Sequence, residues 1–150
     1  MLHQRSFAVL TTACAAALTL AGCASGGQSA GAPGGELAVG HVRGLGPVLV
    51  DGDGQTLYLY VPDARGRSRC YGICASQWPP VLASQHPKLG PGVERAMVGE
   101  VRRRNGAEQV TYDGWPLYRW RFDTTPGQAT GEGKSMGLWW AVSPSGHEVR

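Results

Sequence analysis

The segment Asp53-Gly-Gln-Thr-Leu-Tyr-Leu-Tyr-Val-Pro-Asp63 has a second version further along this chain. That version is Asp113-Gly-Trp-Pro-Leu-Tyr-Arg-Trp-Arg-Phe-Asp123. The positions that match in register are Asp53/Asp113, Gly54/Gly114, Leu57/Leu117, Tyr58/Tyr118, Tyr60/Trp120 and Asp63/Asp123. A tandem duplication is the simplest origin of such a match. The sequence therefore predicts a domain built from two repeats.

Each version begins with a turn signal and continues as a strand. Asp-Gly favours a tight turn because glycine adopts positive φ, and the apolar alternation that follows has the period of two that is typical of strands. In residues 56–61 both faces are apolar, which predicts a strand buried on both sides. Residues 117–122 are expected to form a half-exposed strand. One face of this strand carries Tyr118, Trp120 and Phe122. The opposite face carries Leu117, Arg119 and Arg121.

The aspartate that closes each motif has two interpretations. Asp63 and Asp123 each follow a strand, where an aspartate commonly accepts hydrogen bonds from backbone N–H groups of the next turn. We favour this structural role. The alternative pairs the two carboxyl groups as acid and base across the repeats, as in glycoside hydrolysis.

The N-terminus has the features of a bacterial secretory leader. Arg5 precedes an apolar run from Phe7 to Leu20, and the sequence Leu20-Ala-Gly-Cys23 follows. The run is shorter than the roughly 20 residues that a transmembrane helix needs, so a leader is favoured. Leu-Ala-Gly-Cys also resembles the lipobox of bacterial lipoproteins. The resemblance implies cleavage before Cys23 and attachment of acyl chains such as palmitate at that residue.

These features divide the chain into three parts. We expect a lipoprotein signal peptide at 1–22, a lipidated cysteine with a flexible Gly-rich tether at 23–35, and a β domain at 36–150. Two or more acyl chains hold a protein stably at a membrane. The predicted location is therefore the extracytoplasmic face of the cell membrane, with the outer membrane as the second option in a cell that has one.

Closely spaced turn signals after residue 36 predict an all-β fold, a small antiparallel domain. The repeats are expected at about 48–82 and 108–146, joined by a Pro/Gly-containing linker. Trp78 is expected to fill the core, as buried tryptophan usually does. Strands are expected at 37–42, 47–50, 56–61, 93–101, 108–112, 117–122 and 139–143, with a short helix as the alternative at 93–101.

Cys70 and Cys74 lie within this domain, and an exported protein meets an oxidising compartment. The intervening Tyr-Gly-Ile can turn at Gly72, so we predict a structural disulfide that contributes about 2 kcal/mol. A redox-active pair is the alternative, but that chemistry normally uses a two-residue spacer in a βαβ setting. A two-thiolate metal or haem site is less favoured still, since the sequence has no Cys-x-x-Cys-His.

The net charge of +3 is small and gives little support to a polyanionic partner. One dense basic run, Arg102-Arg103-Arg104, is followed by the turn dipeptide Asn105-Gly106. We expect this run on an exposed hairpin, as ordinary solvated charge. Arginine clusters can contact phosphates, but export argues against nucleic acid. Anionic lipid head groups near the anchor are the more plausible target.

The two motif strands resemble those of a family of predicted bacterial lipoproteins and secreted-repeat proteins, which carry a Tyr-x-aromatic-x-x-Asp motif in two copies. Here the copies are Tyr58-Leu-Tyr60-Val-Pro-Asp63 and Tyr118-Arg-Trp120-Arg-Phe-Asp123. The Cys70–Cys74 spacing with Trp78-Pro-Pro, and the Gly-rich loop with Trp139-Trp140, also look like the family. The resemblance implies an exported or lipid-anchored β domain of no established activity, and it supplies no catalytic residue.

Three functions compete. The favoured one is a non-enzymatic envelope module that binds an unknown protein or ligand through exposed aromatics and the Arg119/Arg121 face, without a cofactor. The alternative is a metal- or haem-handling lipoprotein, and its candidate ligands are His41, His86, His147, Met97 and Met136. An enzyme is least favoured, because Ser143, Ser145 and His147 lack a nucleophile-elbow signature.

Overall fold

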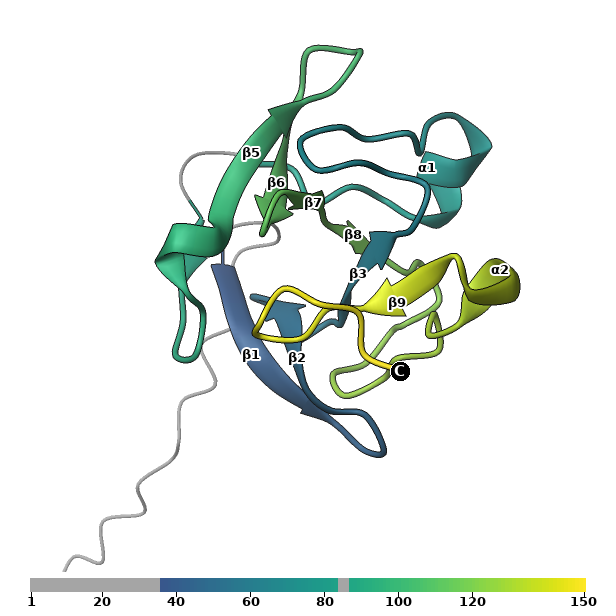
Figure 1. Ribbon diagram of the computed structural model, residues 1–150. Coiled ribbons are helices and arrows are strands. Elements are labelled where there is room, and N and C mark those ends of the chain that lie inside the picture. Colours follow the sequence, from purple (N-terminus) through teal and green to yellow (C-terminus); the bar gives the residue numbers. More distant parts are fainter. Residues whose placement is uncertain (1–35, 84–86) are drawn as a thin grey trace, which may run out of the picture.

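The structure is a computed structural model that describes residues 36–83 and 87–150 (Figure 1). The predicted signal peptide, Cys23, the tether and His86 lie outside the described residues. In the described part, nine strands form three small three-stranded sheets, which confirms the all-β prediction.

Two of the sheets are built around hairpins, and each hairpin precedes one of the two motif strands in the chain. The first contains β1 (Glu36–Val42), β2 (Gly46–Asp51) and β4 (Lys88–Leu89); β1 pairs antiparallel with β2 and parallel with β4. The second contains the antiparallel strands β5 (Val98–Arg102), β6 (Glu108–Tyr112) and β7 (Trp115–Pro116). In each hairpin a turn with positive-φ glycines, such as Gly106, reverses the chain.

The third sheet joins the two repeats directly. It contains β3 (Leu57–Tyr60), β8 (Tyr118–Arg119) and β9 (Trp139–Ala141). β3 pairs antiparallel with β8, so that Tyr58 of the first motif lies opposite Tyr118 of the second. β9 flanks β3, and Pro80 forms a bridge on the far side of β8. The β3–β8 pair is therefore flanked on each side by the segment that follows the other motif in the chain.

The alternating side chains of β3 divide the core into two clusters, as the period of two predicts. Leu57 and Leu59 pack in one cluster with residues such as Leu49 and Leu117. Tyr58 points to the opposite face and packs in the other cluster, which contains the buried tryptophans. Both faces of β3 are thus buried at residues 57–59, whereas the strand predicted over 56–61 ends at Tyr60 and 40% of the surface of Val61 is exposed.

The second motif strand is shorter than predicted. β8 ends at Arg119, and the chain then turns, with Asp123 N–H donating to the carbonyl of Trp120 at 3.0 Å. Phe122 consequently does not share a buried face with Trp120, and 58% of its surface is exposed. The expectation of a strand over 117–122 was wrong at its C-terminal end, because the turn aims Asp123 back into the core.

Short helical segments interrupt the strands. Helix α1 (Ile73–Gln77) begins inside the predicted cysteine turn, and the short turn α2 (Lys134–Gly137) lies at the equivalent point of the second repeat. The 3-10 helix η1 (Arg95–Met97) replaces the first part of the strand expected at 93–101, and β5 covers the rest. Figure 1 shows α1 and α2 on the same side of the domain, beyond the edges of the central sheet.

Candidate functional site

The tyrosines and aspartates of the two motifs are hydrogen-bonded across the repeats. The hydroxyl of Tyr58 donates to Asp123 Oδ2 at 2.5 Å, and the hydroxyl of Tyr118 donates to Asp63 Oδ2 at 2.6 Å. Burial and the neighbouring carboxylate together raise the pKa of both tyrosines, so both hydroxyls keep their protons. The tyrosine of each motif therefore donates its hydrogen bond to the aspartate of the other motif.

The second oxygen of each motif aspartate accepts hydrogen bonds from the chain that follows it. Asp63 Oδ1 accepts from Arg69 N–H at 2.7 Å, and Asp123 Oδ1 accepts from Thr130 N–H at 2.9 Å. This is the structural role favoured from the sequence, although the donors lie six and seven residues onward rather than in the next turn. Both oxygens of each carboxylate are thus bonded within the core, and none of these bonds joins Asp63 to Asp123.

Four aromatic rings stack in a row that alternates between the repeats. Their order is Tyr60, Trp139, Trp78 and Trp120, with centroid separations of 4.3, 3.8 and 4.2 Å. The central pair, Trp78 and Trp139, is parallel within 3°. Trp78 fills the core as predicted, and its partner is the corresponding tryptophan of the second repeat. Stacked rings of this kind contribute about 0.5–1.5 kcal/mol per pair beyond the area they bury.

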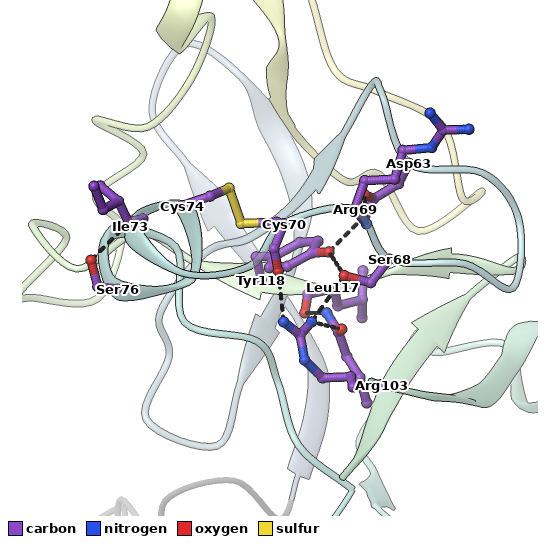
Figure 2. Close-up of a disulfide and its surroundings, with 11 residues drawn as sticks. Asp63, Ser68, Arg69, Cys70, Ile73, Cys74, Ser76, Arg103, Leu117 and Tyr118 are labelled. Atoms are coloured by element: carbon purple, nitrogen blue, oxygen red, sulfur yellow. Dashed lines mark hydrogen bonds between the residues drawn. A yellow bond between two sulfur atoms is a disulfide. The ribbon is translucent and has the colours of Figure 1, made fainter. Parts of the chain in front are cut away.

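A disulfide joins Cys70 and Cys74, whose Cα atoms are 5.3 Å apart, as predicted (Figure 2). Cys70 is fully buried in the aromatic core cluster, and its carbonyl accepts a hydrogen bond of 2.6 Å from Arg103 Nη2. The Cys70 carbonyl therefore links the loop between β3 and α1 to the β5–β6 hairpin.

Arg103 departs from the prediction for the basic run, because only 5% of its surface is exposed. Its Nη1 donates to Ser68 Oγ at 3.0 Å and to the side-chain oxygen of Gln109. Ser68 Oγ in turn hydrogen-bonds to the hydroxyl of Tyr118 at 2.8 Å, which donates to Asp63. Figure 2 shows this continuous network beside the disulfide.

The network places the buried cation of Arg103 and the buried carboxyl group of Asp63 three hydrogen bonds apart. Burial raises the pKa of Asp63, opposed by the hydrogen bonds from Tyr118 and Arg69 and by the positive charge of Arg103. Among the described residues, no carboxylate pairs directly with Arg103. The guanidinium is held mainly by neutral acceptors.

The basic run and the loop before the disulfide line one pocket, of about 330 Å³. Its lining, which we call the arginine pocket, consists of Gly66, Arg67, Ser68, Tyr71, Val101, Arg102, Arg103 and Arg104. The ring of Tyr71 lies 4.7 Å from the Arg103 guanidinium and 4.5 Å from that of Arg104. These cation–π contacts hold the two arginines and the disulfide loop together.

Sequence reasoning missed the arginine pocket because its walls come from distant segments. The alternation in the basic run was a usable signal, since successive residues of an extended hairpin point to opposite sides. Arg102 and Arg104 are exposed while Arg103 points inward. Nothing local in the sequence indicates Ser68 or Gln109 as its acceptors.

The Arg119/Arg121 face predicted as a binding surface is not a continuous free surface. Arg119 Nε forms an ion pair with the buried carboxylate of Asp51, which also accepts N–H bonds from the turn after β2. Arg121 is exposed and lies 5.1 Å from the ring of Phe122. The structure therefore separates the two arginines: Arg119 is committed to an internal ion pair, and Arg121 lies at the exposed turn.

The candidate metal ligands of the described part do not come together. Among residues 36–83 and 87–150, no group of three His, Cys, Asp or Glu side chains is close enough to hold a metal ion. His41 and His147 are exposed, Met97 is partly buried against the leucine-rich core cluster, and 99% of the surface of Met136 is exposed.

The residues weighed for nucleophilic catalysis form a turn. Ser143 Oγ accepts a hydrogen bond of 3.1 Å from the backbone N–H of His147 and lies 2.9 Å from Ser145 Oγ. No hydrogen bond joins the His147 ring to either hydroxyl in the described part of the chain. His147 instead lines a cleft of about 340 Å³ with Trp115 and Arg65. The hydrogen bond from Arg65 is the main cause that lowers the pKa of Asp113.

The fold and these contacts define a class: a β domain of two interlocked repeats, in which each motif completes the other. Comparison with known families divides the chain into the same two repeats. A family model described as a secreted repeat of unknown function matches residues 41–82 and 99–143, more than half of the chain. The protein belongs to this family, which places it outside the cytoplasm. No curated protein and no solved structure matches.

In the described part of the chain, no helix has the length and apolar character needed to cross a membrane.

Proposed function

We propose that this protein is a non-enzymatic binding module, held at the outer side of the cell membrane by acyl chains on Cys23, that binds anionic groups in the arginine pocket. The observation that carries the proposal is the gathering of four arginines around one pocket whose lining contains no acidic residue. A pocket lined by charge of one sign concentrates ligands of the opposite sign.

No ion pair within the described residues involves the arginines of the pocket. The ion pairs there lie elsewhere and join Arg65 to Asp113, Arg119 to Asp51 and Arg150 to Glu148. Glu108 is opposite Arg102 in the β5–β6 register, yet the two are not joined by an ion pair. Since like charges repel, an anion in the pocket would relieve a cost that the free protein bears.

The pocket also replaces the binding surface that the sequence suggested. Arg119 is already committed to Asp51, whereas three of the pocket arginines, Arg67, Arg102 and Arg104, are exposed. Their backbones belong to defined elements: Arg67 to the loop before the disulfide, and Arg102 and Arg104 to the β5–β6 hairpin. Such preorganisation reduces the entropy that binding costs.

The test is thermal unfolding of the full chain in acetate, sulfate and phosphate, each compared with chloride at equal ionic strength. A triple variant (Arg67→Ala, Arg102→Ala, Arg104→Ala) is compared with a control that removes the same charge from exposed positions outside the pocket (Arg43→Ala, Arg121→Ala, Arg150→Ala). The control is needed because sulfate and phosphate stabilise most proteins by exclusion from their surfaces.

We expect at least one anion to raise the melting temperature of the wild type and of the control more than that of the pocket variant. Ligand at 100 times its dissociation constant stabilises a protein by about 2.7 kcal/mol. If all three proteins respond equally to every anion, the arginine pocket is not a binding site and the proposal is wrong.

A further inference from the structure

We infer that the arginine pocket takes a phosphate group with two negative charges, either inorganic phosphate or the terminal group of a phosphate monoester. The inference rests on the proposed function and narrows its ligand from anions in general to one chemical class. It follows from the charge of the pocket and from the donors that Arg103 leaves free.

The charge of the pocket favours a dianion. Four guanidinium groups line it, and the buried carboxyl group of Asp63 is joined to Arg103 by hydrogen bonds only through Ser68 and Tyr118. A carboxylate ligand would bring one negative charge to these four positive ones. A phosphate monoester brings between about 1.5 and 2 at neutral pH, so it compensates more of the repulsion.

The donors of the pocket come from several directions, which suits a tetrahedral group. Arg67 lines the pocket from the loop after β3, whereas Arg102 and Arg104 line it from the β5–β6 hairpin. A carboxylate has two oxygens in one plane, but the terminal group of a phosphate monoester has three oxygens spread in space. Arginine is the side chain best matched to such oxygens because its planar N–H groups bind in pairs.

Arg103 supplies donors that are already fixed in place. Of its five N–H groups, three donate to Ser68, Gln109 and Cys70. Its Nε–H and one N–H of Nη2 have no acceptor among the described residues. The guanidinium is buried and is packed against Tyr71. A phosphate oxygen at this edge of the pocket would accept from charged donors that are already held in place.

The test is isothermal titration of the full chain, with its disulfide intact in nonionic detergent, against inorganic phosphate and against acetate at constant ionic strength. The pocket variant is Arg104→Glu and the matched control is Arg121→Glu. Both residues are exposed arginines that contact one aromatic ring, Tyr71 and Phe122 respectively, and only Arg104 lines the pocket. Neither change touches the buried Arg103, so both variants should fold.

We expect phosphate to bind the wild type and the control with similar affinity, acetate to bind at least about tenfold more weakly, and Arg104→Glu to weaken phosphate binding by about tenfold or more. Equal binding of acetate and phosphate would overturn the inference while leaving the proposed function intact. Failure of every anion to bind would overturn both. Equal phosphate binding by both variants would place the phosphate outside this pocket and overturn the inference.

A second experiment with the same proteins distinguishes a lipid head group from a soluble phosphate as the ligand. Vesicles of phosphatidylcholine with and without phosphatidic acid, whose head group is a phosphate monoester, are sedimented with the three proteins. Each protein also carries Cys23→Ser, so that acyl chains do not bind it to every vesicle. Recruitment by phosphatidic acid that Arg104→Glu weakens and Arg121→Glu retains supports the inference with a lipid as the source. Phosphate binding without such recruitment supports it with a soluble phosphate as the source.

Discussion

The hydroxyl of Tyr118 lies 2.6 Å from Asp63 Oδ2 and 2.8 Å from Ser68 Oγ, so that one side chain of the second repeat joins the first motif to the buried Arg103 network. Replacing Tyr118 with Phe keeps the ring that packs on Trp139 but leaves Asp63 Oδ2 without this donor. An unsatisfied buried acceptor costs about 1–3 kcal/mol. We expect Tyr118→Phe to lower the free energy of unfolding by that amount, measured by urea denaturation.

The control for this prediction is Tyr60→Phe. Tyr60 belongs to the first copy of the motif and, like Tyr118, contacts the ring of Trp139, but its hydroxyl makes no hydrogen bond within the described residues. It should change the stability by less than about 0.5 kcal/mol. Tyr58→Phe should behave like Tyr118→Phe, because its hydroxyl makes the corresponding bond to Asp123. Equal effects of Tyr118→Phe and Tyr60→Phe would contradict the importance of the cross-repeat bond.

Glu132 gives the domain a pH dependence of stability opposite to that of an ion-paired carboxylate. Burial raises its pKa, with a smaller contribution from the charge of Glu148. Its Oε2 accepts Ala141 N–H at 2.7 Å, whereas its buried Oε1 has no partner among the described residues. The folded protein therefore binds this proton more tightly than the unfolded chain. The resulting stabilisation is fully present below the unfolded pKa, about 4.3, and is lost as pH rises through the raised folded value.

We therefore expect Glu132→Gln to be more stable than the wild type at pH 7 and to lose this advantage as the pH falls toward 4. Glutamine keeps an acceptor for Ala141 N–H and carries no charge to desolvate. Urea denaturation at several pH values measures the difference, with Glu100→Gln on the exposed side of β5 as control. A difference from the wild type that stays constant between pH 4 and pH 8 would show that the charge of Glu132 is not its cause.

Local pattern in the sequence was sufficient where neighbours along the chain determine the structure. The alternation of Leu57, Tyr58 and Leu59 predicted which side chains face which core, because a strand places successive residues on opposite faces. The Cys70–Cys74 disulfide could likewise be predicted, because a sequence separation of four with Gly72 between the cysteines allows the ring to close.

Pattern was insufficient where a distant partner determines the structure. Trp120 and Phe122 alternate as a strand does, yet the chain turns after Trp120 because Asp123 has to reach Tyr58 in the other repeat. Arg103 lies in a run that composition assigns to the surface, yet Ser68 and the Cys70 carbonyl bind it in the interior. Both corrections depend on the pairing of the repeats, which a single segment does not encode.

The disulfide is expected to make a modest contribution to the stability of the domain. A ring closed by a sequence separation of four constrains the unfolded chain only slightly, so we expect the double variant Cys70→Ser, Cys74→Ser to lose about 2 kcal/mol. The readout is urea denaturation, with the wild type under reducing conditions as the matched comparison. A loss much larger than in the reduced wild type would indicate that serine at the fully buried position 70, rather than the missing bond, causes the effect.

The lipid anchor is tested at Cys23, where Leu20-Ala-Gly-Cys23 resembles a lipobox. Cells that express the chain are given a palmitate analogue that can be labelled, and the protein is followed through membrane and soluble fractions. We expect the wild type to be labelled and to remain with the membrane, because two or more acyl chains bind a bilayer stably. Cys23→Ser should be unlabelled, whereas the Cys70→Ser, Cys74→Ser variant should be labelled like the wild type. Label on Cys23→Ser would exclude Cys23 as the sole acylation site and would require a different origin for membrane attachment.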